Sequence, residues 1–166
     1  MKRMVLSLMV IASLGMAKND PPAKSQKQKI PSWVERLFVS KKLNEPYEFL
    51  FKISPSYLQG DFNGDKKPDI AVLIKEKNSG KNGIAIFHAG KNEVIILGAG
   101  KDFDGEDDIS WIGSWSVWPK GHVPSNIENE PGPKLKGDAL YLAKDEDGLG
   151  IAYWDGKQYR FYSMGC

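Results

Sequence analysis

Oxygen donors recur at short intervals between Asp61 and Asp69. Counted from Asp61, positions 1, 3, 5 and 9 carry side-chain oxygens and position 7 can add a main-chain carbonyl: Asp61, Asn63, Asp65, Asp69 and Lys67, respectively. Calcium is a hard cation that takes about six to eight oxygen ligands, and a short loop supplies several of them when alternate residues face inward. The spacing therefore predicts a structural Ca²⁺ site. The alternative is a metal-free turn, since Asp, Asn and Gly form turns without an ion.

The same segment resembles the metal loops of FG-GAP or VCBS-type repeats. The resemblance covers residues 59–74, from the loop into the apolar run 70–74. Such repeats occur in integrin-alpha-like propellers and in many exported bacterial proteins, where the loop binds calcium structurally and the domains serve recognition or adhesion. The resemblance therefore implies a recognition role. Lys66 stands where these repeats usually have glycine, and the turn there favours a positive φ, so Lys66 must bear that strain.

A second candidate lies in the segment 102–118, where carboxylates stand beside tryptophans: Asp102, Asp104, Glu106, Asp107 and Asp108, with Trp111 and Trp115. Carboxylates next to aromatic rings are what a glycosidase or a sugar-binding site uses. The same run is also typical of a solvated loop or of a second, weak cation site. Because neighbouring side chains in such a run should diverge, we expect these carboxylates not to be catalytic.

The other reactive residues form no motif. His88 ends an apolar run and His122 lies in a Pro- and Gly-rich loop, without the His and Cys spacing of a zinc site. Cys166 is the only cysteine, so no intramolecular disulfide can form and the fold must rest on packing. No catalytic residue and no organic cofactor are predicted.

Six apolar runs predict the strands that position these residues: 70–74, 83–87, 94–97, 139–143, 150–154 and 158–162. The run 70–74 is apolar on both faces, as a central buried strand would be. Short turns favour an antiparallel meander, and Asp155-Gly156 predicts a hairpin. The region 98–136 stays open, because its tryptophans have helical spacing while 115–117 alternates like a strand.

A short helix is expected before the strands. Ser32 and Glu35 fit a capping box, and the apolar residues of 33–42 share one helical face. We therefore expect an α+β fold, in which a short N-terminal helix packs on a mainly antiparallel sheet of about six or seven strands. Residues 31–166 would form this single globular domain, and the polar, proline-containing stretch 18–30 a disordered linker.

The first 17 residues read as a cleavable signal peptide. Lys2 and Arg3 precede an apolar run that is too short to span a bilayer, and small residues lead to a cut after Ala17. The sequence thus predicts an extracytoplasmic protein, periplasmic or secreted, with no membrane insertion after cleavage. Lys and Arg number 23 against 21 Asp and Glu. Since Lys2 and Arg3 are removed, the charges then balance, and nothing favours a nucleic-acid partner.

These observations favour an exported, non-enzymatic recognition or interaction module, monomeric and stabilised by calcium, with a protein or glycan partner. The C-terminal hairpin supplies aromatic residues whose alternation sends some rings outward, as on a partner-binding surface: Tyr153, Trp154, Tyr159, Phe161 and Tyr162. The alternative function is a small extracytoplasmic hydrolase that acts on glycans through the segment 102–118. An enzyme would need two of its carboxylates to converge in a cleft.

The N-terminal pattern gives the first testable prediction, export with cleavage after Ala17. Mass spectrometry of the protein recovered from outside the cytoplasm should find Lys18 as the first residue, because the cut follows the small-residue site. Recovery of a chain with an intact Met1 in the membrane fraction would contradict it.

Overall fold

The structure is a computed structural model that describes residues 29–121, 123, 131–144 and 147–165. The predicted signal peptide 1–17 and most of the predicted linker lie outside the described residues, as do His122 and Cys166. No helix in the described part of the chain is long and apolar enough to cross a membrane.

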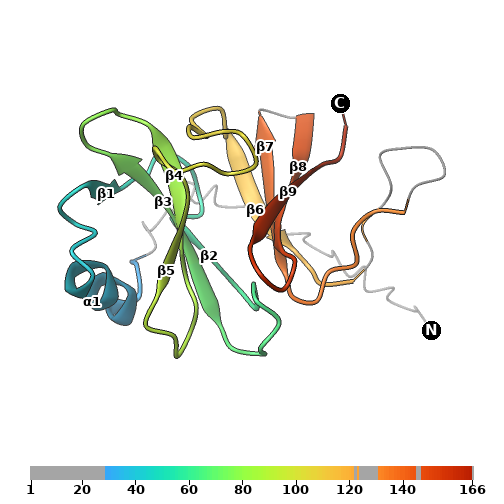
Figure 1. Ribbon diagram of the computed structural model, residues 1–166, viewed down its shortest axis with the longest axis horizontal. Helices are drawn as coiled ribbons and strands as arrows, with labels where there is room; N and C mark the ends of the chain where they lie inside the picture. Colours follow the sequence, from blue (N-terminus) through green and yellow to red (C-terminus); the bar gives the residue numbers. More distant parts are fainter. Residues whose placement is uncertain (1–28, 122, 124–130, 145–146, 166) are drawn as a thin grey trace, which may run out of the picture.

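The strands form two antiparallel sheets (Figure 1). The strands of the first sheet are β1 (Tyr47–Phe49), β2 (Tyr57–Gly60), β3 (Asp69–Glu76), β4 (Asn82–Phe87) and β5 (Val94–Gly98). Their order is β1-β3-β4-β5. Strand β2 pairs with the first half of β3, on the same edge where β1 pairs with its second half. The second sheet runs β6-β7-β8-β9; its strands are β6 (Ser114–Trp118), β7 (Ala139–Lys144), β8 (Asp147–Trp154) and β9 (Tyr159–Ser163). The helix in the described residues is α1 (Ser32–Ser40).

The expected α+β fold with one sheet of about six or seven strands is therefore wrong. The described chain is mostly β, with a five-stranded and a four-stranded sheet and a short helix. The reason lies in β3, which is apolar on both faces and buried from Asp69 to Ile74. A strand of this kind needs a covering layer on each side, and one layer is the helix while the other is the second sheet.

Three apolar layers follow from this arrangement. Successive side chains of β3 point to opposite faces of the first sheet. On one face, Ile70, Val72 and Ile74 pack with Val34 and Phe38 of α1. The opposite face of the first sheet packs on the second sheet in the main core, which contains Ala71, Leu73, Ile84, Ile86, Leu140 and Leu142. The outer face of the second sheet is covered from the 119–137 segment by Val123 and Leu135, which pack with Ala139 and Ile151.

The predicted helix is confirmed in outline, but its start differs. Ser32 lies inside α1, and the cap position belongs to Pro31, whose carbonyl accepts hydrogen bonds from the N–H groups of Val34 (2.9 Å) and Glu35 (3.4 Å). No side chain caps this end, so the expected capping box does not form. Proline suits a position where the helix has no use for its N–H.

All six predicted strands are present as β3, β4, β5, β7, β8 and β9. The Asp155-Gly156 hairpin joins β8 to β9, with Gly156 at a φ of 107°. The 115–117 alternation is that of strand β6, in which Trp115 is buried in the main core. Strand β1, with three residues, was not predicted, and the bounds of β2, with four, were not predicted either.

A buried hydrogen bond joins the two sheets near one end of the sandwich. His88, which follows β4, places Nε2 at 2.8 Å from the hydroxyl of Tyr159, the first residue of β9. Both side chains are buried, and both rings contact Trp154. The bond satisfies two polar groups that would otherwise be orphaned between the sheets.

We therefore predict that Tyr159→Phe lowers the free energy of unfolding by about 1–3 kcal/mol, because it leaves a nitrogen of the buried His88 without its partner. Urea unfolding followed by circular dichroism measures the change. Tyr57→Phe is the matched control, since it removes the same hydroxyl from a half-exposed ring and should change stability by less than about 0.5 kcal/mol. Equal stability of the two variants would contradict a structural role for this bond.

Candidate functional site

Asp69 organises the loop that the sequence singled out. The residue is fully buried at the start of β3. Its Oδ2 accepts hydrogen bonds from the N–H groups of Phe62 (3.0 Å) and Asn63 (3.3 Å), and its Oδ1 accepts one from Ala89 (2.8 Å). Burial raises the pKa of Asp69, and the main-chain N–H groups oppose that rise. The carboxylate therefore closes the loop 61–69 onto β3 and fastens it to the segment after β4.

The outer part of the loop consists of successive turns. Asn63 Oδ1 accepts a hydrogen bond from the N–H of Asp65 (2.9 Å), and Asp65 Oδ1 accepts one from Lys67 (3.0 Å). The Lys67 carbonyl accepts a hydrogen bond from the N–H of Asp69 (3.1 Å). Lys66 has a φ of 67°, as the resemblance to the repeats required. These are the Asx-type turns that Asp and Asn form with the local main chain.

Asp61 connects the loop to the second sheet through Asp138, next to the start of β7. The Asp61 N–H donates to Asp138 Oδ2 (2.9 Å), and the Asp138 N–H donates to the Asp61 carbonyl (2.7 Å). A Cβ on Gly137 would lie 2.3 Å from that carbonyl, so only glycine permits the approach. The other oxygen of Asp138 accepts a hydrogen bond from the N–H of Lys120 (3.0 Å). Sequence reasoning missed Asp138, because no local motif marks it.

The donor set of the loop suits a hard cation, but its acidic groups are not gathered. Among the described residues, no group of three or more His, Cys, Asp or Glu side chains is placed to hold a metal ion. Asp65 is exposed, whereas Asp69 is buried among main-chain N–H groups. One atom does lack a partner, since Asp61 Oδ1 is buried and makes no hydrogen bond. An oxygen of this kind fits a ligand of Ca²⁺.

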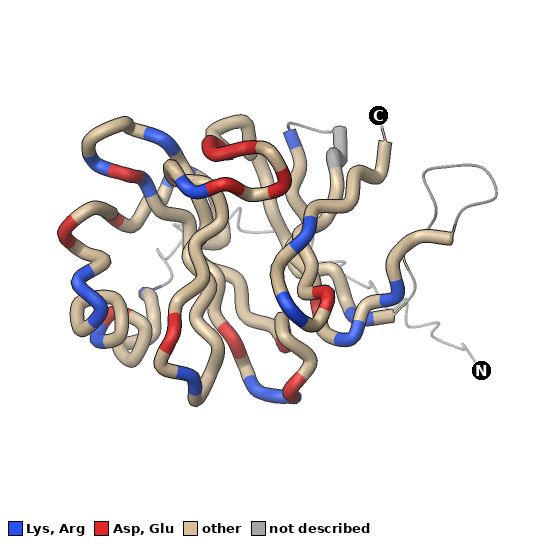
Figure 2. Tube along the Cα trace, viewed as in Figure 1, with Lys and Arg blue, Asp and Glu red and all other residues tan. Residues whose placement is uncertain are grey.

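The acidic run follows β5 and lies in the loop that leads to β6 (Figure 2). Its carboxylates were expected to diverge, and most have separate partners, but Asp104 and Glu106 line the same cavity. Asp104 binds β9, where one oxygen accepts the N–H of Phe161 and the other pairs with Arg160 at 3.2 Å. The partners of three other acidic residues are separate: Asp102 accepts the Gly105 N–H, Asp107 pairs with Lys81, and Asp108 accepts the Asn82 and Ser110 N–H groups. These contacts fix the loop to both sheets.

Glu106 differs from the other acidic residues because its partner is an aromatic side chain. Its Oε2 accepts a hydrogen bond from the indole N–H of Trp111 at 2.9 Å. No cation of the described chain pairs with it, in contrast to Asp104 and Asp107. Glu106 therefore has no positive side chain of the described residues in contact.

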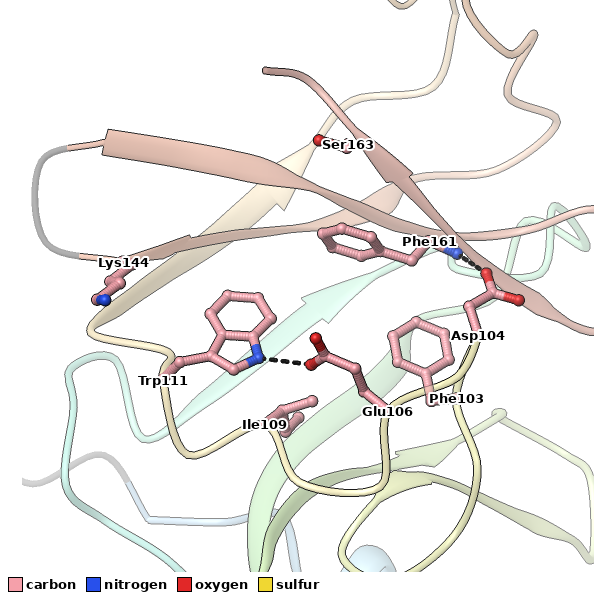
Figure 3. A pocket seen from close by; sticks show the side chains of 8 residues that line it. All are labelled: Phe103, Asp104, Glu106, Ile109, Trp111, Lys144, Phe161 and Ser163. Carbon is pink, nitrogen blue, oxygen red and sulfur yellow. Dashed lines mark hydrogen bonds between the residues drawn. The ribbon is translucent and has the colours of Figure 1, made fainter. Parts of the chain in front are cut away.

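A cavity of about 420 Å³ lies where this loop meets the second sheet (Figure 3). Apolar side chains form much of its wall, and polar groups stand among them; the lining residues are Phe103, Asp104, Glu106, Ile109, Trp111, Lys144, Phe161 and Ser163. The cavity has the size and the mostly apolar lining of a small-ligand site. It is the strongest candidate site in the described part of the chain.

The aromatic rings of the cavity hold one another edge to face. Phe161 meets Trp111 at a centroid distance of 6.2 Å and an angle of 72°, and it meets Phe103 at 6.2 Å and 80°. Such contacts are favourable for aromatic quadrupoles, so the rings support each other's position. Trp115, which the sequence placed beside the acidic run, is instead buried in the core, where its indole N–H donates to the Pro55 carbonyl (2.9 Å).

Sequence reasoning therefore found half of this site. The acidic run and Trp111 were recognised as a cluster, and Phe161 was among the aromatic residues expected to include outward rings. Lys144 and Ser163 were missed, because they come from β7 and β9 and only the pairing of the second sheet brings them near the loop. No protein-family model, curated protein or solved structure matches the chain. The resemblance of residues 59–74 to FG-GAP and VCBS repeats thus stays a prediction.

Proposed function

We propose that the protein is an exported, non-enzymatic recognition module that takes a group of its protein or glycan partner into the aromatic cavity. The observation that carries this proposal is the cavity itself, whose wall is held by hydrogen bonds of the chain. Asp104 holds the loop to β9, and the Trp111 hydrogen bond holds Glu106 in the wall. A site that needs little ordering on binding loses less affinity to conformational entropy.

The alternative, a glycan hydrolase, is less well supported by this geometry. A glycosidase needs two carboxyl groups on either side of the bond that is cleaved, one of them acting as an acid. Asp104 and Glu106 both line the cavity, but both oxygens of Asp104 are engaged by Arg160 and by the Phe161 N–H. Only Glu106 remains for chemistry, so binding accounts for the arrangement better than catalysis.

Calcium is proposed as a structural ion of the loop 61–69 and not as part of the cavity. The support is the donor set, together with the buried Asp61 Oδ1 that no hydrogen bond satisfies. A bound ion would supply the partner that this oxygen lacks, with Asn63, Asp65, Asp69 and the Lys67 carbonyl as further ligands. Export would suit such a site, because extracellular calcium modules bind at about 10⁻⁴–10⁻³ M.

The binding proposal is tested by titrating the ¹⁵N-labelled exported chain with chito-oligosaccharides, cello-oligosaccharides, organic ammonium salts and Phe- or Lys-containing peptides. At least one class should shift the NMR signals of the Trp111 indole N–H and the Phe161 amide, and Phe161→Ala should abolish the shift. Phe51→Ala is the control, since it removes an aromatic ring that is 41% exposed and does not line the cavity.

The same titration distinguishes binding from hydrolysis. Mass spectrometry of the oligosaccharides after incubation should find them intact, because one available carboxylate does not complete a glycosidase pair. If the wild type cleaves the oligosaccharides, and Asp104→Asn or Glu106→Gln abolishes the cleavage without changing the melting temperature, the protein is a hydrolase and the recognition proposal is wrong.

For calcium, we predict that the ion raises the melting temperature of the wild type. At a free concentration about a hundredfold above the dissociation constant, an ion that binds only the folded chain stabilises it by about 2.7 kcal/mol. Scanning calorimetry with calcium and with chelator measures this shift. Asp65→Ala should remove it, whereas Glu48→Ala, which removes an exposed acid of β1, should leave it intact. If calcium does not change the melting temperature of the wild type, the loop is a metal-free turn.

A further inference from the structure

We propose that the group bound in the aromatic cavity is an organic ammonium ion, such as an alkylammonium or a quaternary ammonium. The inference rests on the proposed function, because it names the chemistry of the ligand that this same cavity takes. It is carried by two features: the carboxylate of Glu106, which no cation of the described chain contacts, and the arrangement of the aromatic rings around it.

The charge of the cavity is the first feature. Asp104 and Glu106 both line the wall, but the Asp104 charge is met by Arg160 at 3.2 Å. Glu106 is held only by the neutral indole of Trp111 (2.9 Å), and no ion pair of the described chain involves it. Glu106 is exposed, so water screens its charge in part, and a cation gains from this carboxylate by direct contact.

The aromatic rings are the second feature. The ring planes of Trp111 and Phe161 meet at 72°, and those of Phe161 and Phe103 meet at 80°. The three rings therefore face different directions around the same space (Figure 3). The face of an aromatic ring attracts a cation within about 6 Å of its centroid, with tryptophan the strongest. Rings combined with a carboxylate are the usual means of holding an ammonium group whose methyl or methylene carbons also contact the apolar wall.

Two N–H groups of the cavity wall already have partners. The Trp111 indole N–H is used by Glu106, and the Phe161 main-chain N–H is used by Asp104. Lys144 and Ser163 also bring donor groups to the cavity wall. Lys144 lies across Trp111 from Glu106 (Figure 3) and is exposed, so its charge does not neutralise the carboxylate by contact.

Two sources could present this chemistry, a lysine side chain of a polypeptide or a small quaternary ammonium compound. The cavity of about 420 Å³ has room for more than the cationic group, so the attached chain would also be enclosed. The experiment therefore uses one probe for each source, Nα-acetyl-lysine N-methylamide and choline. The neutral probe is 3,3-dimethylbutan-1-ol, which has the shape of choline with carbon in place of the charged nitrogen.

Binding of the three probes to the wild-type exported chain is measured by NMR titration on the Trp111 indole N–H. At least one cationic probe should bind roughly tenfold or more tightly than the alcohol, since the cation interacts with both the rings and the carboxylate. Preference for acetyl-lysine methylamide would indicate a polypeptide source, and preference for choline a small-molecule source. Because this comparison needs only the wild type, it does not depend on whether a variant folds.

Variants then locate the effect. Glu106→Gln keeps an oxygen that can accept the indole hydrogen bond but removes the charge, so the affinity for the cation should fall roughly tenfold while that for the alcohol stays the same. Glu48→Gln is the matched control, because it makes the same change at an exposed acid of β1 that does not line the cavity, and it should leave the affinity for the cation unchanged.

The possible failures are distinguishable. Equal affinity for choline and its neutral analogue, or cation binding that Glu106→Gln does not weaken, would overturn the ammonium proposal and leave the cavity as a recognition site for apolar groups. Binding of an oligosaccharide alone would overturn it in favour of a glycan ligand and would support the recognition module. Shifts that map away from the Trp111 and Phe161 signals for every probe would overturn both proposals.

Discussion

The buried carboxylate of Asp69 is the constraint on which the joint between the two sheets depends. A fully buried carboxylate is tolerated only if hydrogen bonds replace the lost water, and here three main-chain N–H groups do so. To supply them, the chain must fold back over 61–69 and approach Ala89. That path delivers Asp61 to Asp138 beside β7 and His88 to Tyr159 on β9. The loop that resembles a metal site is thus a structural joint whether or not an ion is bound.

The loop that lines the aromatic cavity is likewise held by carboxylates, which accept main-chain N–H groups or pair with cations. The acidic residues of 102–108 bind β9, the turn before β4 and their own loop, so the loop has little freedom once the sheets have packed. Most carboxylates of this segment hold the loop, and Glu106 is the one that makes no ion pair and contacts Trp111 in the cavity wall. Composition therefore overstated the chemistry of this segment, because most of its acids hold the loop in place.

Local features were predictable from the sequence, whereas the layering was not. The apolar runs gave six strands, the Asp-Gly pair gave a hairpin, and the position of Lys66 gave a positive φ, since each depends on neighbouring residues only. The division into two sheets depends on pairs far apart in the chain, such as Tyr159 with His88 and Asp138 with Asp61. The apolar run 70–74 did contain the signal, because a strand buried on both faces needs two covering layers. For the same reason, Lys144 could not be assigned to the site before β7 was paired.

The hydrogen bond from the Phe161 N–H to Asp104 has a consequence for how separate molecules meet. β9 ends its sheet, so its outer N–H and C=O groups would offer a template to a strand of another chain. Asp104 occupies one of these donors and brings a carboxylate, while Arg160 beside it adds a second charge at the edge. An incoming strand would have to displace the aspartate and bury both charges. The edge is therefore protected against strand-to-strand aggregation by the residue that also anchors the loop of the cavity.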